Sequence, residues 1–85
     1  LGLFTPVFDD EEFEQRTQEL VTRVATGPTV ALEESKRLIE AGLNRTIGEA
    51  IEAEADSLHT TLASADHAEG ARSFVEQREP DFSGE

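Results

Sequence analysis

Apolar residues recur at three- and four-residue intervals along most of the chain, with polar and acidic residues between them. This spacing places the apolar residues on one face of an α-helix. The clearest stripe comprises Ile47, Ile51, Ala55, Leu58 and Leu62. The pattern predicts helices over residues 9–26, 28–42, 46–64 and 66–78. The chain is therefore predicted to be an all-α domain of three to four amphipathic helices.

Residues at the predicted helix ends carry start and stop signals. Thr46 with Glu49, and Asp66 with Glu69, match the capping box, in which paired side chains satisfy backbone N–H groups at a helix start. Pro80 prevents the last helix from continuing, because proline has no N–H and clashes with the preceding turn. The residues after it, 81–85, are therefore expected to fray.

Two segments are expected to pack closely. In the second predicted helix, the stripe of Ala31, Ser35, Leu38 and Gly42 is rich in small residues, which permit a neighbouring helix to approach. The first eight residues, LGLFTPVF, are too apolar to be left exposed. They are expected to pack either on the chain's own helices or on an upstream domain, and the sequence leaves both alternatives open.

Charge narrows the range of partners. The 85 residues carry 19 acidic and 7 basic side chains, for a net charge of −12. Such a surface repels nucleic-acid phosphate and anionic lipid, so neither nucleic acid nor a membrane is an expected partner. The scarcity of lysine favours a halophilic protein over an ordinary acidic one. No apolar run approaches the roughly 20 residues that span a bilayer, and a cytoplasmic protein is expected.

Catalytic and metal-binding patterns are not found in the sequence. His59 and His67 fall on different predicted helices, without HExxH spacing and without any cysteine, so no metal site is predicted. Lys36 lies among acidic residues and is predicted to be an ordinary surface charge, because an activated lysine needs desolvation or a special neighbour. Glu52 and Asp56 are predicted to be solvated rather than a catalytic pair. No catalytic residue is therefore predicted in this chain.

Four segments resemble, in order, the C-terminal part of the crotonase superfamily, which comprises the enoyl-CoA hydratases and isomerases. The last segment, DHAEGARSFVEQREPDF at residues 66–82, matches best, being similar to a family helix of the type D-h-x-E-G-x-x-x-F-x-E-K-R followed by proline and phenylalanine. The other three are GLFTPVFDDEEF, ELVTRVATGPTVALEESKRLIEAG and TIGEAIEAEADSL. Together they cover nearly the whole chain.

The resemblance implies that residues 1–85 are the C-terminal helical domain of a crotonase fold, with the catalytic core lying upstream. In that family the core stabilises an enolate-like transition state in an oxyanion hole. The parent would be an enoyl-CoA hydratase, a lyase of fatty-acid metabolism, or a related isomerase. The family's C-terminal domain builds a homotrimer, often a dimer of trimers. This segment alone is expected to be inactive, and no cofactor is expected because coenzyme A is part of the acyl-CoA substrate.

The resemblance also implies three coenzyme A-binding positions. Phe74 corresponds to a family phenylalanine that packs near the adenine, and Gln77 to a lysine that can meet a phosphate. Because glutamine carries no charge, Arg78 is a candidate to compensate. The helix is expected to close its own active site or a neighbouring subunit's. The main alternative to the enzyme interpretation is a stand-alone acidic helical module that binds another protein.

Overall fold

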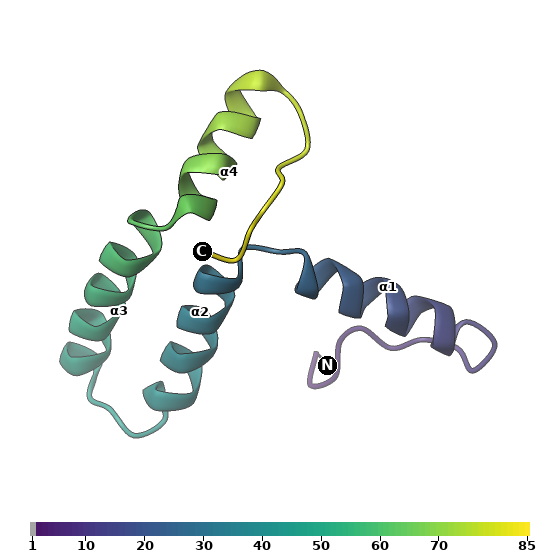
Figure 1. The fold of residues 1–85 in the computed structure, drawn as a ribbon. Helices are drawn as coiled ribbons and strands as arrows, with labels where there is room; N and C mark the ends of the chain where they lie inside the picture. The colour runs from purple at the N-terminus through teal and green to yellow at the C-terminus, as the bar shows by residue number, and fades with distance from the viewer. Residues whose placement is uncertain (1) are drawn as a thin grey trace.

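The computed structural model describes residues 2–85 and contains four α-helices, with no β-strand in that range. These are α1 (Phe13–Ala25), α2 (Thr29–Gly42), α3 (Ile47–Leu62) and α4 (Ala65–Glu76), as Figure 1 shows. The predicted all-α fold class is confirmed. Leu1, the first residue of the apolar N-terminal segment, lies outside the described residues.

The first helix begins later than the predicted residue 9. Residues 10–12 form a turn, in which the Glu12 N–H donates to the Asp9 carbonyl oxygen at 3.0 Å. The regular helix starts only at Phe13. The four acidic residues at positions 9–12 therefore precede the helix. Their negative charge still lies near the positive end of the helix dipole.

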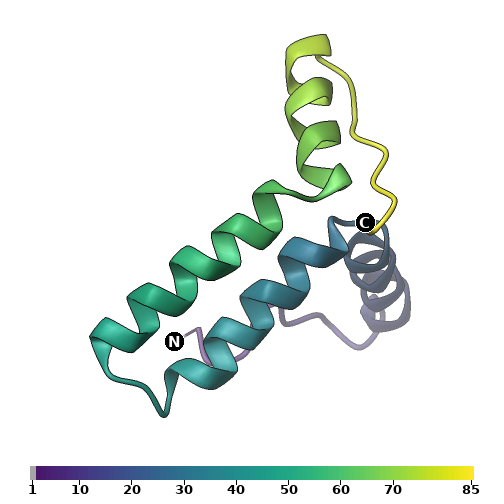
Figure 2. The same cartoon turned by 60° about the vertical axis from the view of Figure 1, so that its left-hand side comes forward.

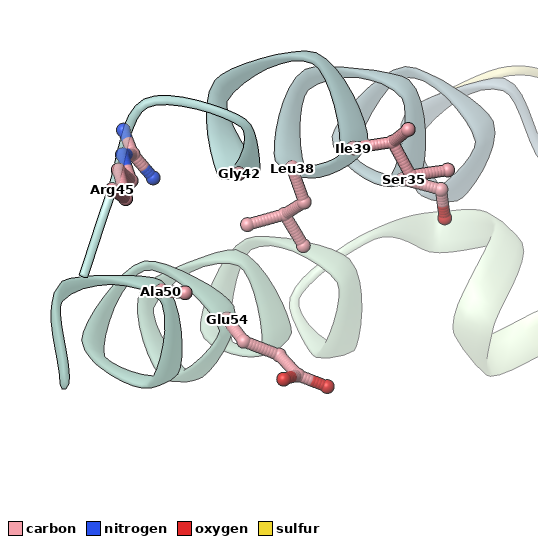
Figure 3. A pocket seen from close by; sticks show the side chains of 7 residues that line it. All are labelled: Ser35, Leu38, Ile39, Gly42, Arg45, Ala50 and Glu54. Atoms are coloured by element: carbon pink, nitrogen blue, oxygen red, sulfur yellow. The ribbon is translucent and has the colours of Figure 1, made fainter. Parts of the chain in front are cut away.

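Helices α2 and α3 lie side by side and antiparallel, joined by a short loop (Figures 1 and 2). The small-residue stripe of α2 faces α3, since Ala31, Ser35 and Leu38 line the same groove as Ser57. Figure 3 shows the Leu38 side chain directed toward α3. Ser57 is only 4% exposed. The predicted close packing is confirmed only in part, because Ser35 and Gly42 of the stripe are exposed and a Cβ added at Gly42 would meet nothing within 4 Å. Among the described residues, α2 and α3 still make the most extensive helix–helix contact.

The capping box predicted at the start of α3 is confirmed. The Glu49 N–H donates to Thr46 Oγ1 at 3.3 Å, and the Thr46 N–H donates to Glu49 Oε2 at 2.8 Å. Two backbone donors that a helix start leaves unpaired are satisfied in this way. The cap fixes where α3 begins after its loop with α2.

The large apolar side chains point away from this packed pair. Among residues 2–85, no hydrophobic residue is fully buried. The α3 stripe predicted from the sequence is exposed along its length, with Ile47 at 81%. The whole chain exposes 7251 Å² of surface, whereas a compact monomer of 9.3 kDa exposes about 5,000 Å². The helices therefore present apolar faces that nothing in the described part of the chain covers.

The apolar N-terminal segment is also largely uncovered. Its residues Leu3, Phe4 and Val7 are each exposed. Only Phe8 is partly covered, because the Arg16 guanidinium carbon lies 5.4 Å from the centre of its ring. For the described residues, the alternative that the whole segment packs on the chain's own helices is therefore wrong. The other alternative, that the segment packs on an upstream domain, stays a prediction.

The end of the C-terminal tail, residues 81–85, does not fray, contrary to the sequence prediction. Figure 1 shows this C-terminal tail (residues 77–85) turning back at the end of α4 and running toward the start of α2. The buried carboxylate of Asp66 accepts the backbone N–H groups of Ser83 and Gly84, at 2.7 and 2.9 Å. Helix α4 ends at Glu76, before Pro80 is reached, and side-chain acceptors on α4 then bind the extended backbone.

Removing the α3 cap is expected to destabilise the helix. Thr46→Ala deletes both hydrogen bonds of the Thr46 hydroxyl and is expected to lower the free energy of unfolding by about 1 kcal/mol, measured by urea denaturation followed by circular dichroism. Thr60→Ala is the matched control, since the Thr60 hydroxyl bonds only the Asp56 carbonyl at 3.4 Å. Equal losses in the two variants would contradict a specific capping effect.

Candidate functional site

The three candidate coenzyme A-binding residues lie together where α4 ends. Gln77 adopts the left-handed conformation with φ 55° and ψ 43°. Its N–H donates to the Phe74 carbonyl at 3.3 Å, and the Arg78 N–H donates to the Ser73 carbonyl at 3.1 Å. These paired bonds define a Schellman motif, in which glycine usually occupies the left-handed position. A glutamine here needs the surrounding structure to hold it, because a side chain disfavours positive φ.

Phe74 projects from this end of the helix into solvent. Its side chain is 85% exposed, and that of the neighbouring Val75 is 80% exposed. Phe74 does not lie on the buried face of α4, because the residues that α4 buries are Asp66 and Ser73. The face of α4 that turns inward is polar, and its carboxylates and hydroxyls bind backbone groups instead of packing in an apolar core.

Arg78 is held by two carboxylates. Its Nη1 and Nη2 lie 2.5 and 3.0 Å from the two carboxylate oxygens of Glu69, and its Nε lies 2.6 Å from Glu76 Oε2. Bidentate pairing of this kind is the strongest geometry available to arginine. It raises the pKa of Arg78 further above its ordinary value. The guanidinium is thus directed back at α4, whereas the Gln77 side chain is exposed and outside these ion pairs.

Glu69, on α4, binds both the Arg78 side chain and the backbone of Asp81. Besides Arg78, its Oε1 accepts the backbone N–H of Asp81 at 3.0 Å. The hydrogen bond from Arg78, followed by that from Asp81, lowers the pKa of Glu69 to about 2. The carboxylate is therefore ionised in every ordinary buffer and acts as a fixed anchor for the turn, not as an acid or base.

Asp66 anchors the end of the tail one turn earlier on the helix. It is 2% exposed, and its own N–H donates to the Glu85 carbonyl at 3.0 Å. The prediction that it caps α4 together with Glu69 is wrong. Ser64 is the cap, since its hydroxyl accepts the His67 N–H at 3.1 Å. The relevant signal in the sequence is the presence of two carboxylates one helical turn apart, followed by a proline and a returning segment.

Other candidate groups are ordinary surface residues. Lys36 pairs with Glu40 across 3.9 Å at the surface, as predicted. His59 lies in α3 and His67 in the first turn of α4, and within residues 2–85 no three His, Cys, Asp or Glu side chains gather where a metal could bind. An open groove between α2 and α3 is lined by Leu38, Arg45 and Glu54 among others (Figure 3). None of the described helices is long and apolar enough to cross a membrane.

These features define a helical unit with a firmly held C-terminal turn and uncovered apolar faces. Comparison with known families is more specific. The family model described as enoyl-CoA hydratase/isomerase matches residues 1–85. The chain belongs to this family, which confirms the resemblance found in the sequence.

Individual relatives agree with this assignment. A 1,2-epoxyphenylacetyl-CoA isomerase of Escherichia coli K12 is 32% identical over 98% of this chain. A probable enoyl-CoA hydratase of Rhodobacter capsulatus is 31% identical over 99% of it. The crystal structure of an enoyl-CoA hydratase from Geobacillus kaustophilus HTA426 superposes with a TM-score of 0.87 over 99% of the chain, at 31% identity. The chain spans only 32%, 33% and 32% of these proteins, respectively.

The low pKa of Glu69 predicts a specific response to mutation of its partner. Folding depresses this pKa, so the stability that it contributes is complete above the ordinary value of 4.5 and is lost as the pH falls toward about 2. Arg78→Gln removes the largest cause of the shift and is expected to return the pKa of Glu69 toward 4.5, measured by carboxyl ¹³C NMR titration.

The neighbouring arginine provides the control. Arg72 Nη1 lies 3.9 Å from Glu69 Oε2 and its side chain is 64% exposed, so Arg72→Gln is expected to raise the pKa of Glu69 far less. Equal shifts in the two variants would show that general surface charge, and not the bidentate pair, sets this pKa.

Proposed function

We propose that this chain is the C-terminal helical part of an acyl-CoA enzyme whose parent reaction is hydration of a 2-enoyl-CoA. In this reaction, hydroxide from water bonds to C3 and a proton bonds to C2, and the double bond is consumed. The observation that carries the proposal is the match of the entire chain to the family together with the 0.87 TM-score to a hydratase. A double-bond shift in the same substrate is the related alternative, favoured by the likeness to an isomerase.

The catalytic groups are proposed to come from the part of the enzyme that precedes this segment. An oxyanion hole there would polarise the thioester carbonyl, which stabilises the negative charge that develops in the transition state. Two glutamates of this chain, Glu34 and Glu69, are unsuited to acid–base work. Glu34 is paired with Arg37, and Glu69 with Arg78; these hydrogen bonds lower both carboxyl pKa values. A general base or acid instead needs a pKa near the working pH.

The contribution proposed for this segment is to close the coenzyme A site. Phe74 is free to stack on the adenine ring because its side chain is 85% exposed. Gln77 can offer an amide to a phosphate or ribose group at the same end of the helix. Arg78 is proposed to support the turn that presents both residues, since its guanidinium is occupied by Glu69 and Glu76. Coenzyme A enters as part of the substrate, and no separate cofactor is proposed.

The segment is also proposed to build a homotrimer. Its surface exceeds that of a compact monomer by more than 2,000 Å² when about 5,000 Å² is taken for the latter, and a standard stable interface buries about 1,600 Å² in total. The exposed stripe of α3, including Ile51 and Leu58, is a suitable part of such an interface. A dimer of trimers is the higher assembly that the family's pattern suggests.

Assembly can be measured directly. The full-length protein is expected to have the mass of three or six subunits by light scattering. Ile51→Asp places a charge in the exposed apolar stripe and is expected to shift the mass toward the monomer. Glu52→Lys, at the adjacent exposed position, is the control and is expected to leave the mass unchanged. A monomeric wild-type protein would contradict the assembly proposal.

The enzymatic proposal is tested with crotonyl-CoA. The full-length protein is expected to hydrate it, and Phe74→Ala to raise KM about tenfold with a much smaller change in kcat, because base stacking on an aromatic ring contributes about 1–3 kcal/mol. Val75→Ala is the matched control, since Val75 is a similarly exposed apolar neighbour. The 85-residue chain alone is expected to be inactive, and activity from it would contradict the proposed division of labour.

A stand-alone acidic module that binds another protein is the second candidate function. The uncovered apolar faces favour it equally well, because any partner surface could cover them. Absence of crotonyl-CoA turnover by the full-length protein, together with a monomeric mass, would favour this candidate. A cytoplasmic location, a role in fatty-acid metabolism and a halophilic source are proposed alongside the enzymatic function; the halophilic proposal rests on the net charge of −12.

A further inference from the structure

Backbone N–H groups hold the distal part of the C-terminal tail, whereas Arg78 holds the start of the tail through its side chain. Glu69 accepts the N–H of Asp81, and Asp66 accepts the N–H groups of Ser83 and Gly84. Both carboxylates lie on α4, three residues apart, so they face the same side of the helix. Charge-assisted bonds to backbone amides are stronger than neutral ones. Three backbone N–H groups of the extended tail are thus bound by carboxylates of one helix.

The tail also links α4 to α2. A Cβ on Gly84 would lie 3.2 Å from Thr29 Oγ1, which places the end of the tail against the first residue of α2. The Phe82 ring passes over α4, since a Cβ on Gly70 would lie 3.8 Å from Phe82 Cε1. Figure 2 shows the tail spanning the space between the free end of α4 and the start of α2. The tail is therefore a brace between two helices that are separated by α3 in the sequence.

Helix α4 depends on this brace, because it has little other support. Its outward face carries Phe74 and Val75, both exposed, and its buried residues Asp66 and Ser73 are polar. Asp66 makes its bonds to the tail, and the Ser73 hydroxyl bonds only the Gly70 carbonyl of the same helix. Within the described chain, no apolar residue of α4 is buried against a neighbour.

We propose that Glu69 is a positioning residue for acyl-CoA binding: it ties the tail and Arg78 to α4, and so fixes the turn that presents Phe74 and Gln77. This inference rests on the proposed coenzyme A contact of those two residues. Glu69 itself is not proposed to touch the ligand. Its effect is to keep Gln77 in the left-handed conformation and α4 in a single orientation, which lowers the ordering that binding would otherwise require.

The test compares two alanine variants in the full-length protein. Glu69→Ala is expected to accelerate hydrogen exchange of the Asp81 amide at least about tenfold, because that amide loses a charged acceptor. The Ser83 and Gly84 amides, which Asp66 holds, are expected to change less. Glu52→Ala removes the same charge from the exposed surface of α3 and is expected to leave all three amides unchanged. Alanine favours a helix, so poorer helix propensity cannot explain the effect.

The same variants separate positioning from simple stabilisation. Glu69→Ala is expected to raise KM for crotonyl-CoA about tenfold while kcat changes less than about twofold. Glu69→Gln keeps an oxygen that can accept the Asp81 N–H, and is expected to restore part of both the amide protection and the KM. If Glu69→Ala fails to fold, the Glu69→Gln variant carries the test through the same two measurements.

The two measurements can fail separately. Unchanged exchange at Asp81 in both Glu69 variants would overturn the brace, whatever the protein binds. Faster exchange with an unchanged KM would overturn the positioning role. If the wild-type protein neither turns over nor binds crotonyl-CoA, the proposed function fails, while the exchange measurement still decides whether Glu69 holds the tail.

Discussion

The structure depends on one constraint, which is that the described chain buries no large apolar side chain against itself. Hydrophobic burial is normally the dominant favourable term in folding. Here α2 and α3 meet through Ala31, Leu38 and Ser57, while the apolar stripe of α3 and the side chains of Phe74 and Val75 on α4 remain exposed. The described chain therefore supplies little hydrophobic burial itself, because each of its large apolar side chains is exposed or only partly buried. A family member that spans about a third of its relatives is consistent with this arrangement.

Polar groups give the segment its definite shape in place of a core. A capping box fixes the start of α3, and a Schellman turn fixes the end of α4. Asp66 and Glu69 then return the tail along the helix. Each oxygen of the buried Asp66 carboxylate accepts a backbone N–H, which offsets the penalty for removing a charge from water. These directional bonds specify geometry well, and they leave the apolar faces free to meet other surfaces.

The contrast between bonded polar groups and exposed side chains also describes how the candidate site is organised. Exposed Phe74 and Gln77 are available to a ligand, whereas the conspicuous cation, Arg78, is committed to Glu69 and Glu76. A position that matches a binding motif in sequence can thus serve as support in the folded chain. Two carboxylates at this turn, those of Glu69 and Glu76, are likewise paired with Arg78.

The sequence by itself determined the local features: an all-α chain of three to four amphipathic helices, the Thr46–Glu49 cap and the family. Helical periodicity and capping act over one or two turns, so they can be read directly from residue spacing. Only the tertiary structure decided that Asp66 binds the tail instead of capping α4, and that Phe74 is exposed. Those outcomes depend on a chain reversal that brings residues 17 and 18 positions apart into contact, and no local pattern specifies which surface such a reversal covers.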